Sequence, residues 1–475
     1  MNRLTRTVSF TVLGAGLAAG YFGWQHYSQN RDWALQRPAL PALTGDSSPG
    51  LDARLQASAR RLETWPPNLP ALIEFTRVCH ANGAFESAIS GYGVLVILQP
   101  AEPRWPYSLA AILAGYGRLD EALPLLKRAV AMAPDYVPAR LKLGEALLKA
   151  NDLPGAEQAF AEVLRREAEN PHAMLGLARC SLEADRLTAA RAQLQRLVTA
   201  HPDFTSAQSL LGSVFERLGN TQGADLARAR VRRGGHYPDP ADPWINALIA
   251  ECHDPYTLLI AASAALADKR PQDALPILER GLALAPQDAR LHRQLGKTRA
   301  FGGDLVAARA ELEQAVNLDP TNDAIHLDLL IILRRVNDPA ALEAAIARAS
   351  AACPTSAALR YEAGLIASRA GRLEEATNHL EYAWRTQPDQ TAAAFEAAVV
   401  RFRRAQPAEA IALLEDVLAR YPEDGTASLM LLRHGIEVGD ARTDEWLARA
   451  TASNPAAPAL AELRETYQRC FSASR

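Results

Sequence analysis

The chain has 475 residues, which is too long for one compact hydrophobic core, so its length predicts several domains or an elongated array. Apolar residues make up 48% of it but aromatic residues only 6%, a composition that suits closely packed helices better than a sheet. The 51 Lys and Arg residues against 54 Asp and Glu residues give a formal net charge of -3. No global basic field is present to attract nucleic acid, so we expect no DNA or RNA partner.

Residues 1–24 have the pattern of a membrane anchor. Arg3 and Arg6 precede residues 7–24, which contain no charged residue. A helix of this length spans about 27 Å, enough for the hydrocarbon core, and the arginines place the N-terminus in the cytoplasm. The small residues Ala18-Ala19-Gly20 leave a cleaved signal peptide as the alternative. Both interpretations export the rest of the chain.

A glycine pattern in the same segment could suggest a cofactor. Gly14, Gly16 and Ala19 match the dinucleotide-binding spacing, but a Pro-rich stretch follows in place of a second strand with an acidic end. We therefore expect no cofactor.

Proline and alanine recur with one period over most of the chain. Every step between the prolines is 34 or twice 34 within two runs, Pro66, Pro100, Pro134 and Pro202, then Pro286, Pro320, Pro354, Pro388 and Pro422. Twelve residues before most of these positions stands alanine, with one missed step at Leu342. A fixed period of this length indicates stacked supersecondary units. Alanine lets two helices approach closely, and proline ends the second helix because it has no N–H.

These residues resemble the tetratricopeptide repeat, and the segment from Leu109 through Ala122 and Ala129 to Pro134 fills nearly every position of that motif. The resemblance implies an all-α, superhelical solenoid of antiparallel helix pairs, here preceded by one N-terminal transmembrane helix. Ten units are expected to begin at residues 69, 103, 137, 171, 205, 255, 289, 323, 357 and 391.

The same register predicts the organisation of the whole chain. We expect a cytoplasmic n-region (1–6), a transmembrane signal anchor (7–24), a Pro-rich linker (25–50), a lone helix as a partial repeat (51–68), five units (69–238), an inserted spacer helix (239–254), five further units (255–424), and a degenerate repeat with a capping helix (425–475). The capping helix should run over residues 459–471, with Leu460, Leu463, Tyr467 and Phe471 on one face.

The insertion shifts the register, so that the unit after the one at 205 begins at 255 and not at 239. Asp242 and Pro243 look like an N-cap and a first helical position, so a short helix through about Glu251 should follow, as a hinge between the two runs. Metal ligand types gather here, namely His236, Asp239, Cys252, His253 and Asp254. Adjacent ligands at 252–254 do not have the spacing of a stable zinc site, so we expect no metal.

In the family that the chain resembles, positions 2, 5, 9, 12 and 13 of each unit line a concave groove. This register gives a candidate partner-binding groove of Arg293, Lys297, Arg334, Arg335, Tyr361, Arg369, Phe395 and Arg403. Because Arg335, Arg369 and Arg403 are one period apart, their guanidiniums could hold an acidic or carboxylate-bearing segment. Basic residues near helix C-termini are also favoured by the helix dipole, so capping is the open alternative.

No catalytic motif accompanies the repeats, so we expect a non-enzymatic scaffold for protein or peptide partners. The insertion and the segment 103–107 loosely resemble features of exported bacterial tetratricopeptide proteins. This implies a single-pass protein of the inner membrane with its repeats in the periplasm, or a periplasmic or secreted protein if the signal is cleaved. The alternative function is an accessory assembly factor of an envelope machine for cytochrome maturation, polysaccharide export or outer-membrane assembly.

Overall fold

The computed structural model describes residues 25, 28, 29, 32–41, 49–232, 237–453 and 457–471. Within these ranges all regular secondary structure is helical, and there is no strand. The expected membrane span, residues 7–24, lies outside them, as does the n-region before it. Among the helices of the described residues, none combines the length and the hydropathy that crossing a bilayer requires.

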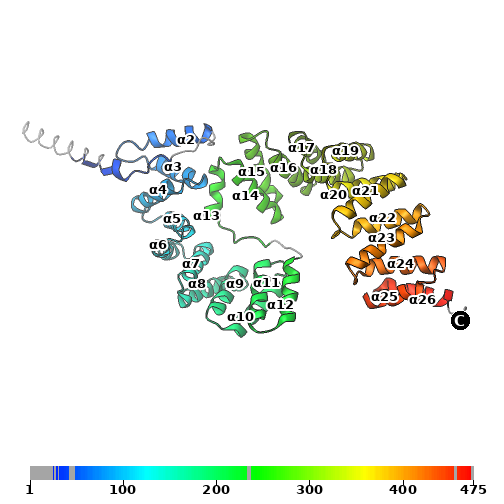
Figure 1. The fold of residues 1–475 in the computed structure, drawn as a ribbon. Helices are drawn as coiled ribbons and strands as arrows, with labels where there is room; N and C mark the ends of the chain where they lie inside the picture. Colours follow the sequence, from blue (N-terminus) through cyan, green and yellow to red (C-terminus); the bar gives the residue numbers. More distant parts are fainter. Residues whose placement is uncertain are drawn as a thin grey trace, which may run out of the picture. The chain divides into compact units, whose positions relative to one another are not determined.

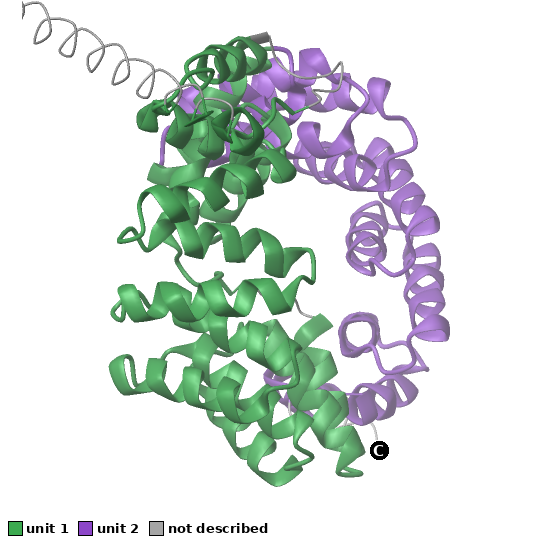
Figure 2. Cartoon of the chain, turned by 90° about the vertical axis from the view of Figure 1, so that its left-hand side faces the viewer, with its two compact units in different colours: residues 1–286 green, residues 287–475 purple. Residues whose placement is uncertain are grey.

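The chain divides into two compact units, residues 1–286 and 287–475 (Figure 2). The described helices of unit 1 are α2 (Pro49–Arg60), α3 (Leu69–Ala81), α4 (Phe85–Leu98), α5 (Arg104–Gly115), α6 (Leu119–Met132), α7 (Val137–Lys149), α8 (Leu153–Arg166), α9 (Pro171–Glu183), α10 (Leu187–Ala200), α11 (Thr205–Arg217), α12 (Thr221–Arg232), α13 (Pro243–Asn246), the 3-10 helix η1 (Ala247–Glu251), α14 (Pro255–Ala267) and α15 (Pro271–Leu284). The described helices of unit 2 are α16 (Ala289–Phe301), α17 (Leu305–Leu318), α18 (Asp323–Val336), α19 (Pro339–Ala352), α20 (Ala357–Arg369), α21 (Leu373–Thr386), α22 (Ala392–Arg403), α23 (Pro407–Arg420), α24 (Gly425–Val438), α25 (Thr443–Ser453) and α26 (Pro458–Phe471).

Each repeat consists of a first helix, A, packed against a second helix, B. The periodic alanines lie in this contact, and Ala122, Ala156 and Ala376 are fully buried there. A glycine of helix A faces the same contact: a Cβ atom at Gly364 would lie 2.5 Å from the Leu380 side chain. The small residues are therefore required because the two helices leave no room for a larger side chain.

The turn between helices A and B contains a residue with positive φ, which recurs with the period of the repeat. In the first run these residues are Gly83, Gly117, Asn151, Asp185 and Gly219, and in the second run they are Lys269, Gly303, Asn337, Gly371, Ala405 and Gly439. The step from Gly219 to Lys269 is longer than one period, because the insertion lies between them. Glycine adopts this conformation without steric cost, whereas a residue with a Cβ atom is strained there.

In the full repeats that carry the periodic proline, helix B ends two residues before it. Thus α6 ends at Met132 before Pro134, and α17 ends at Leu318 before Pro320. Helix α8 also ends at this point, at Arg166, although Ala168 replaces the proline. There the side chain of Asn170 caps the next helix by accepting a hydrogen bond from the Ala173 amide. The proline therefore contributes to the helix end without being essential for it.

The insertion does more than join the two runs of repeats. Residues 237–254, which we call the returning segment, pack through α13 and η1 against α5 and α3 at the start of unit 1 (Figure 1). Asp242 is the N-cap of α13 and Pro243 its first residue, so this part of the prediction is confirmed. Arg280 of α15 hydrogen-bonds to the Ala250 carbonyl. The α14–α15 pair belongs to unit 1, so the division between the units falls one repeat later than the insertion.

The last helix closes unit 2 as the sequence indicates. Helix α26 packs against α24 and α25 and buries Leu460 and Leu463. Trp446 of α25 is 1% exposed beneath it. A terminal repeat lacks one neighbour, and this helix covers the apolar face that would otherwise be left open.

Replacing Ala405 by glycine should stabilise unit 2. Ala405 has φ 54°, a left-handed conformation that costs a residue with a Cβ atom about 1–2 kcal/mol. The greater freedom of glycine in the unfolded chain offsets about 0.4–1 kcal/mol of this, so the net gain should be about 0.5–1 kcal/mol. The measurement is the urea midpoint for the loss of helix signal in unit 2, made on the full chain.

The matched control is Gly371→Ala at the equivalent turn, where φ is 77° and an added Cβ atom meets nothing within 4 Å. Gly371→Ala should lower the midpoint, because the new Cβ atom touches no neighbour and adds only the cost of the left-handed backbone conformation. Midpoint shifts of the same sign in both variants would contradict the strain argument.

Candidate peptide-binding surface

In unit 2 the A helices lie next to one another. Helix α16 contacts α18, α18 contacts α20, and α20 contacts α22. We call the surface that these four helices share the A-helix face of unit 2. Residues that are one period apart have the same position in consecutive A helices, so they form rows across this face.

One row on this face is apolar. Ile331 of α18 is 51% exposed and Val399 of α22 is 41% exposed, while Leu365 of α20 occupies the position between them. The predicted groove residues Tyr361 and Phe395 stand at another position of α20 and α22, and both are partly buried. Exposed apolar side chains that recur on neighbouring helices form a patch of the kind that binds partners.

Two of the predicted basic residues are paired within the chain. The Arg293 Nε atom lies 2.6 Å from an Asp328 carboxylate oxygen, and Arg334 forms an ion pair with Glu362. These carboxylates come from the next A helix in each case, so the pairs link consecutive repeats. Their charges are largely compensated before any partner arrives.

The predicted arginine ladder serves partly as a set of helix caps. Arg335 Nη1 donates to the Ala300 carbonyl at 3.3 Å, and Arg403 Nη1 donates to the Ser368 carbonyl at 3.3 Å and to the Ser368 hydroxyl at 2.9 Å. Each acceptor lies in the last turn of the preceding A helix. Unit 1 repeats this contact between Arg217 and the Leu182 carbonyl at 3.4 Å. Arg335 and Arg403 therefore do cap a helix C-terminus, but it is that of the preceding A helix.

Capping leaves part of each guanidinium available. In the described part of the chain, the bonds of Arg335 and Arg403 use only Nη1, and a carbonyl oxygen does not neutralise the charge. Arg369 and Lys297 are exposed, and neither forms a hydrogen bond or an ion pair with any described residue. Whether these four side chains bind a partner stays a prediction.

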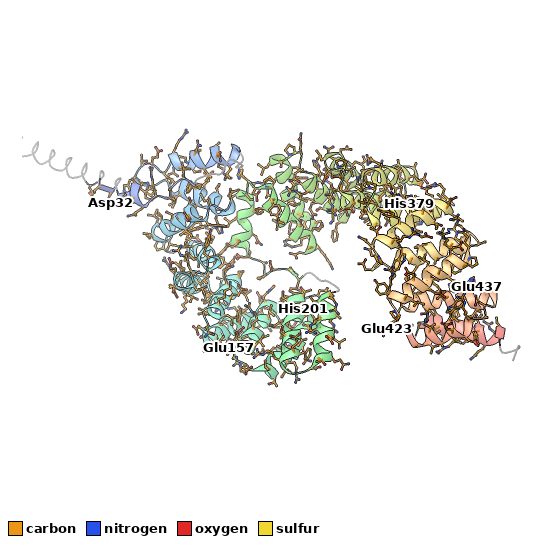
Figure 3. The ribbon with its side chains drawn as sticks, viewed as in Figure 1. Asp32, Glu157, His201, His379, Glu423 and Glu437 are labelled. Atoms are coloured by element: carbon orange, nitrogen blue, oxygen red, sulfur yellow. The ribbon has the colours of Figure 1, made fainter. Side chains whose placement is uncertain are left out.

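The ladder ends with a change of charge. Figure 3 labels Glu437 on α24, one repeat beyond Arg403, where an exposed carboxylate takes the place of the guanidinium. The basic stretch thus covers α18, α20 and α22. Burial, together with the nearby carboxylates Glu396 and Glu362, raises the pKa of Tyr361, so its hydroxyl stays neutral and can donate a hydrogen bond.

The metal ligand types of the insertion have other roles. Asp254 caps α14 by accepting hydrogen bonds from the Tyr256 and Thr257 amides, and Cys252 is buried. His236 lies outside the described residues. Nowhere in the described ranges do three His, Cys, Asp or Glu side chains come close enough to hold a metal ion.

The repeat spacing, the buried small residues and the paired helices agree with a comparison against known families. A model of the tetratricopeptide repeat matches residues 113–166, 148–214, 265–326 and 367–434. The chain contains tetratricopeptide repeats. Proteins built from this repeat bind protein partners, and the resemblance seen in the sequence is thereby confirmed as to the repeat itself.

Known proteins match parts of the chain. Cellulose synthase operon protein C of Pseudomonas fluorescens is 26% identical over 216 residues, which is 44% of this chain and 16% of that protein. DnaJ homolog subfamily C member 3 of Rattus norvegicus is 30% identical over 30% of this chain and 28% of its own length. The solved structure of yeast Tom70 is 14% identical, with a TM-score of 0.34, over 85% of this chain and 95% of that chain. The chain thus covers less than a third of the length of cellulose synthase operon protein C and of DnaJ homolog subfamily C member 3.

Arg403 and Arg369 should differ in their effect on stability. Arg403→Ala removes two hydrogen bonds to the end of α20 and should destabilise unit 2 by about 0.5–1 kcal/mol, a modest value because the side chain is exposed. Arg369→Ala removes no hydrogen bond to a described residue and should leave the urea midpoint unchanged. An equal loss in both variants would argue against the capping role.

Proposed function

We propose that the chain is a non-catalytic scaffold that holds a protein partner on the A-helix face of unit 2. The observation that carries this proposal is the exposure of Ile331 on α18 and Val399 on α22, with the half-buried Leu365 on α20 between them and the exposed cations Lys297 and Arg369 on the same face. An apolar row with positive charge beside it suits an extended segment that presents apolar side chains together with carboxylates.

The contacts that such a segment would make can be assigned by chemistry. Apolar side chains of the partner would cover Ile331, Leu365 and Val399, and the removal of this apolar surface from water would favour binding. A partner carboxylate would face Arg369, whose guanidinium can donate two parallel hydrogen bonds. Arg335 and Arg403 stand one repeat before and one repeat after Arg369, and their remaining N–H groups would attract further negative charge of the partner. Affinity would come from several repeats at once.

The proposal includes an envelope location. The uncharged residues 7–24 with Arg3 and Arg6 before them support a single-pass anchor in the inner membrane and repeats in the periplasm, with a cleaved signal as the alternative. The partner would then be an envelope protein.

A second candidate function is an accessory role in polysaccharide export. It is favoured by the similarity to cellulose synthase operon protein C from two bacteria, Pseudomonas fluorescens and Xanthomonas axonopodis, at 26% and 27% identity. The matched part is 16% of each relative, so the similarity concerns a small portion of those proteins. Cells without the chain should secrete less polysaccharide if this candidate holds, and unchanged secretion would remove it.

The scaffold proposal predicts that acidic substitutions on the A-helix face of unit 2 weaken partner capture. In cells that make the tagged full chain, Arg369→Glu combined with Ile331→Glu should reduce the amount of the co-purified partner at least ~10-fold, because two buried, mismatched contacts each cost more than about 1 kcal/mol. The partner recovered with the unchanged chain is quantified by mass spectrometry in each variant.

The matched control is Arg348→Glu, a reversal of an exposed arginine on α19, which is helix B of the repeat that carries Ile331. It should keep full capture. Retained capture in the double variant, with its helical content unchanged by circular dichroism, would remove the groove proposal.

The location can be tested separately. An alkaline phosphatase domain fused after residue 475 should be active in a bacterial host, because this enzyme needs disulfides that form outside the cytoplasm. Deletion of residues 1–24 should abolish the activity, whereas exchange of Arg348 for Glu should not. An active fusion without residues 1–24 would contradict the role given to this segment.

A further inference from the structure

The returning segment, residues 237–254, is much longer than the junction between two repeats requires. Between other consecutive repeats, helix B is joined to the next helix A by four or five residues, as between α6 and α7 or between α21 and α22. Between α12 and α14 the chain instead inserts residues 233–254. The described part of this insertion crosses the A helices of unit 1 in reverse order, from α11 back to α3.

The segment begins at an aromatic site at the far end of this path. The ring of Tyr237 stacks on Phe204, the N-cap of α11, with the centroids 4.2 Å apart and the planes at 16°. The Tyr237 hydroxyl is 3.2 Å from Nδ1 of His201, which Figure 3 labels at the end of α10. His172 of α9 lies against the same ring.

Its centre is held by two tyrosines and a carboxylate. Tyr136, the N-cap of α7, donates to Asp242 Oδ1 at 2.5 Å, and Tyr107 of α5 donates to Oδ2. The indole of Trp244 stacks on the Tyr136 ring with centroids 3.6 Å apart and planes at 11°, and it meets the Tyr107 ring edge-on at 5.4 Å. The Trp244 amide also donates to the Tyr136 hydroxyl at 3.0 Å.

This centre is a built site and not a loose contact. Tyr107 is fully buried, and burial with the Asp242 carboxylate beside it raises the pKa of both tyrosines, so their hydroxyls remain donors at every working pH. A carboxylate that accepts two phenolic hydrogen bonds is well satisfied. The stacked indole adds the apolar contact that such a charged group cannot supply.

The C-terminal end of the segment, residues 251–253, is held through its backbone and one carboxylate. Asn82, the C-cap of α3, donates to the Glu251 carbonyl at 3.0 Å and accepts from the His253 amide at 2.6 Å. Because the Asn82 side chain binds one backbone carbonyl and one backbone amide, it fixes the direction of the segment but does not depend on the side chains of the segment. The Glu251 carboxylate binds Arg54 at 2.7 Å and lies 3.7 Å from Arg77.

Three of the residues that contact the segment stand at positions that face the groove in the family that the chain resembles. His172, Tyr107 and Arg77 stand at positions 2, 5 and 9 of their units, counted from residues 171, 103 and 69. The A-helix face of unit 1, formed by α3, α5, α7 and α9, is therefore occupied by the chain itself.

We propose that this face is a peptide-binding site for a segment with a carboxylate two residues before an indole, and that Asp242 and Trp244 fill it in cis. A partner segment of the same chemistry binds unit 1 only when the returning segment leaves. The proposal does not rest on the function assigned to unit 2, because the two faces lie in different units and share no residue.

The test is binding of the returning segment in trans. A fluorescein-labelled peptide with the sequence of residues 237–254 is titrated into the full chain and into its Asp242→Ala/Trp244→Ala variant, and fluorescence anisotropy is measured. Tethering gives the cis segment a local concentration on the order of 1 mM, so for a peptide Kd of about 10 μM the variant should bind the peptide ~100-fold more tightly than the unchanged chain. Adding Tyr136→Ala to the variant should abolish this gain.

Two controls make the result decisive. A peptide with alanine at the positions of Asp242 and Trp244 should bind neither protein. If the double variant loses helical content, the Asp242→Asn variant, which keeps the shape of the side chain, takes its place and should show an intermediate gain in affinity. Equal affinity of the unchanged chain and the folded variants for the peptide would overturn the proposal, and so would equal binding of the two peptides.

Discussion

The two helices of each repeat pack so closely that a few positions can hold nothing larger than a hydrogen atom or a methyl group. At Gly364 an added Cβ atom would meet Leu380 at 2.5 Å, and at Gly144 it would meet Phe160 at 2.7 Å. A similar close contact between helices A and B is found at Gly296, where an added Cβ atom would meet Leu312 at 2.7 Å, and each helix pair in turn packs against the next pair. Because no central core forms, every pair keeps a surface of helix A that must be covered, solvated or used for binding.

The surface of the A helices is covered in one unit and exposed in the other. In unit 1 the A helices carry tyrosine, histidine and asparagine side chains that engage the returning segment, and their polar groups are satisfied within the chain. In unit 2 the A helices carry Ile331 and Val399 with exposed cations near them. One fold therefore presents a face already filled by an acidic and aromatic segment, and another whose apolar and basic character suits a segment from elsewhere.

The sequence predicts the local structure well because the information is periodic and local. The spacing of alanine and proline indicates the helix pairs, the Asp242-Pro243 dipeptide indicates the start of α13, and the apolar face of residues 459–471 indicates the capping helix. The contact between Tyr107 and Asp242 joins distant parts of the chain and depends on the path of the whole segment. The aromatic residues of both stretches are visible in the sequence, but a single sequence holds no sign that they meet. The acceptors of Arg335 and Arg403 could not be predicted either, since a carbonyl in the preceding repeat is one of many possible acceptors.

The returning segment also changes how unit 1 responds to heat or force. A plain stack of repeats is a one-dimensional chain in which each pair feels only its neighbours, so its ends fray first and unfolding spreads pair by pair. Bonds from residues 237–254 to α3, α5, α7 and the start of α11 connect pairs that are distant in this chain. Opening any one of these pairs breaks contacts to the others, so unit 1 should unfold more cooperatively than unit 2, in which each pair contacts mainly its neighbours.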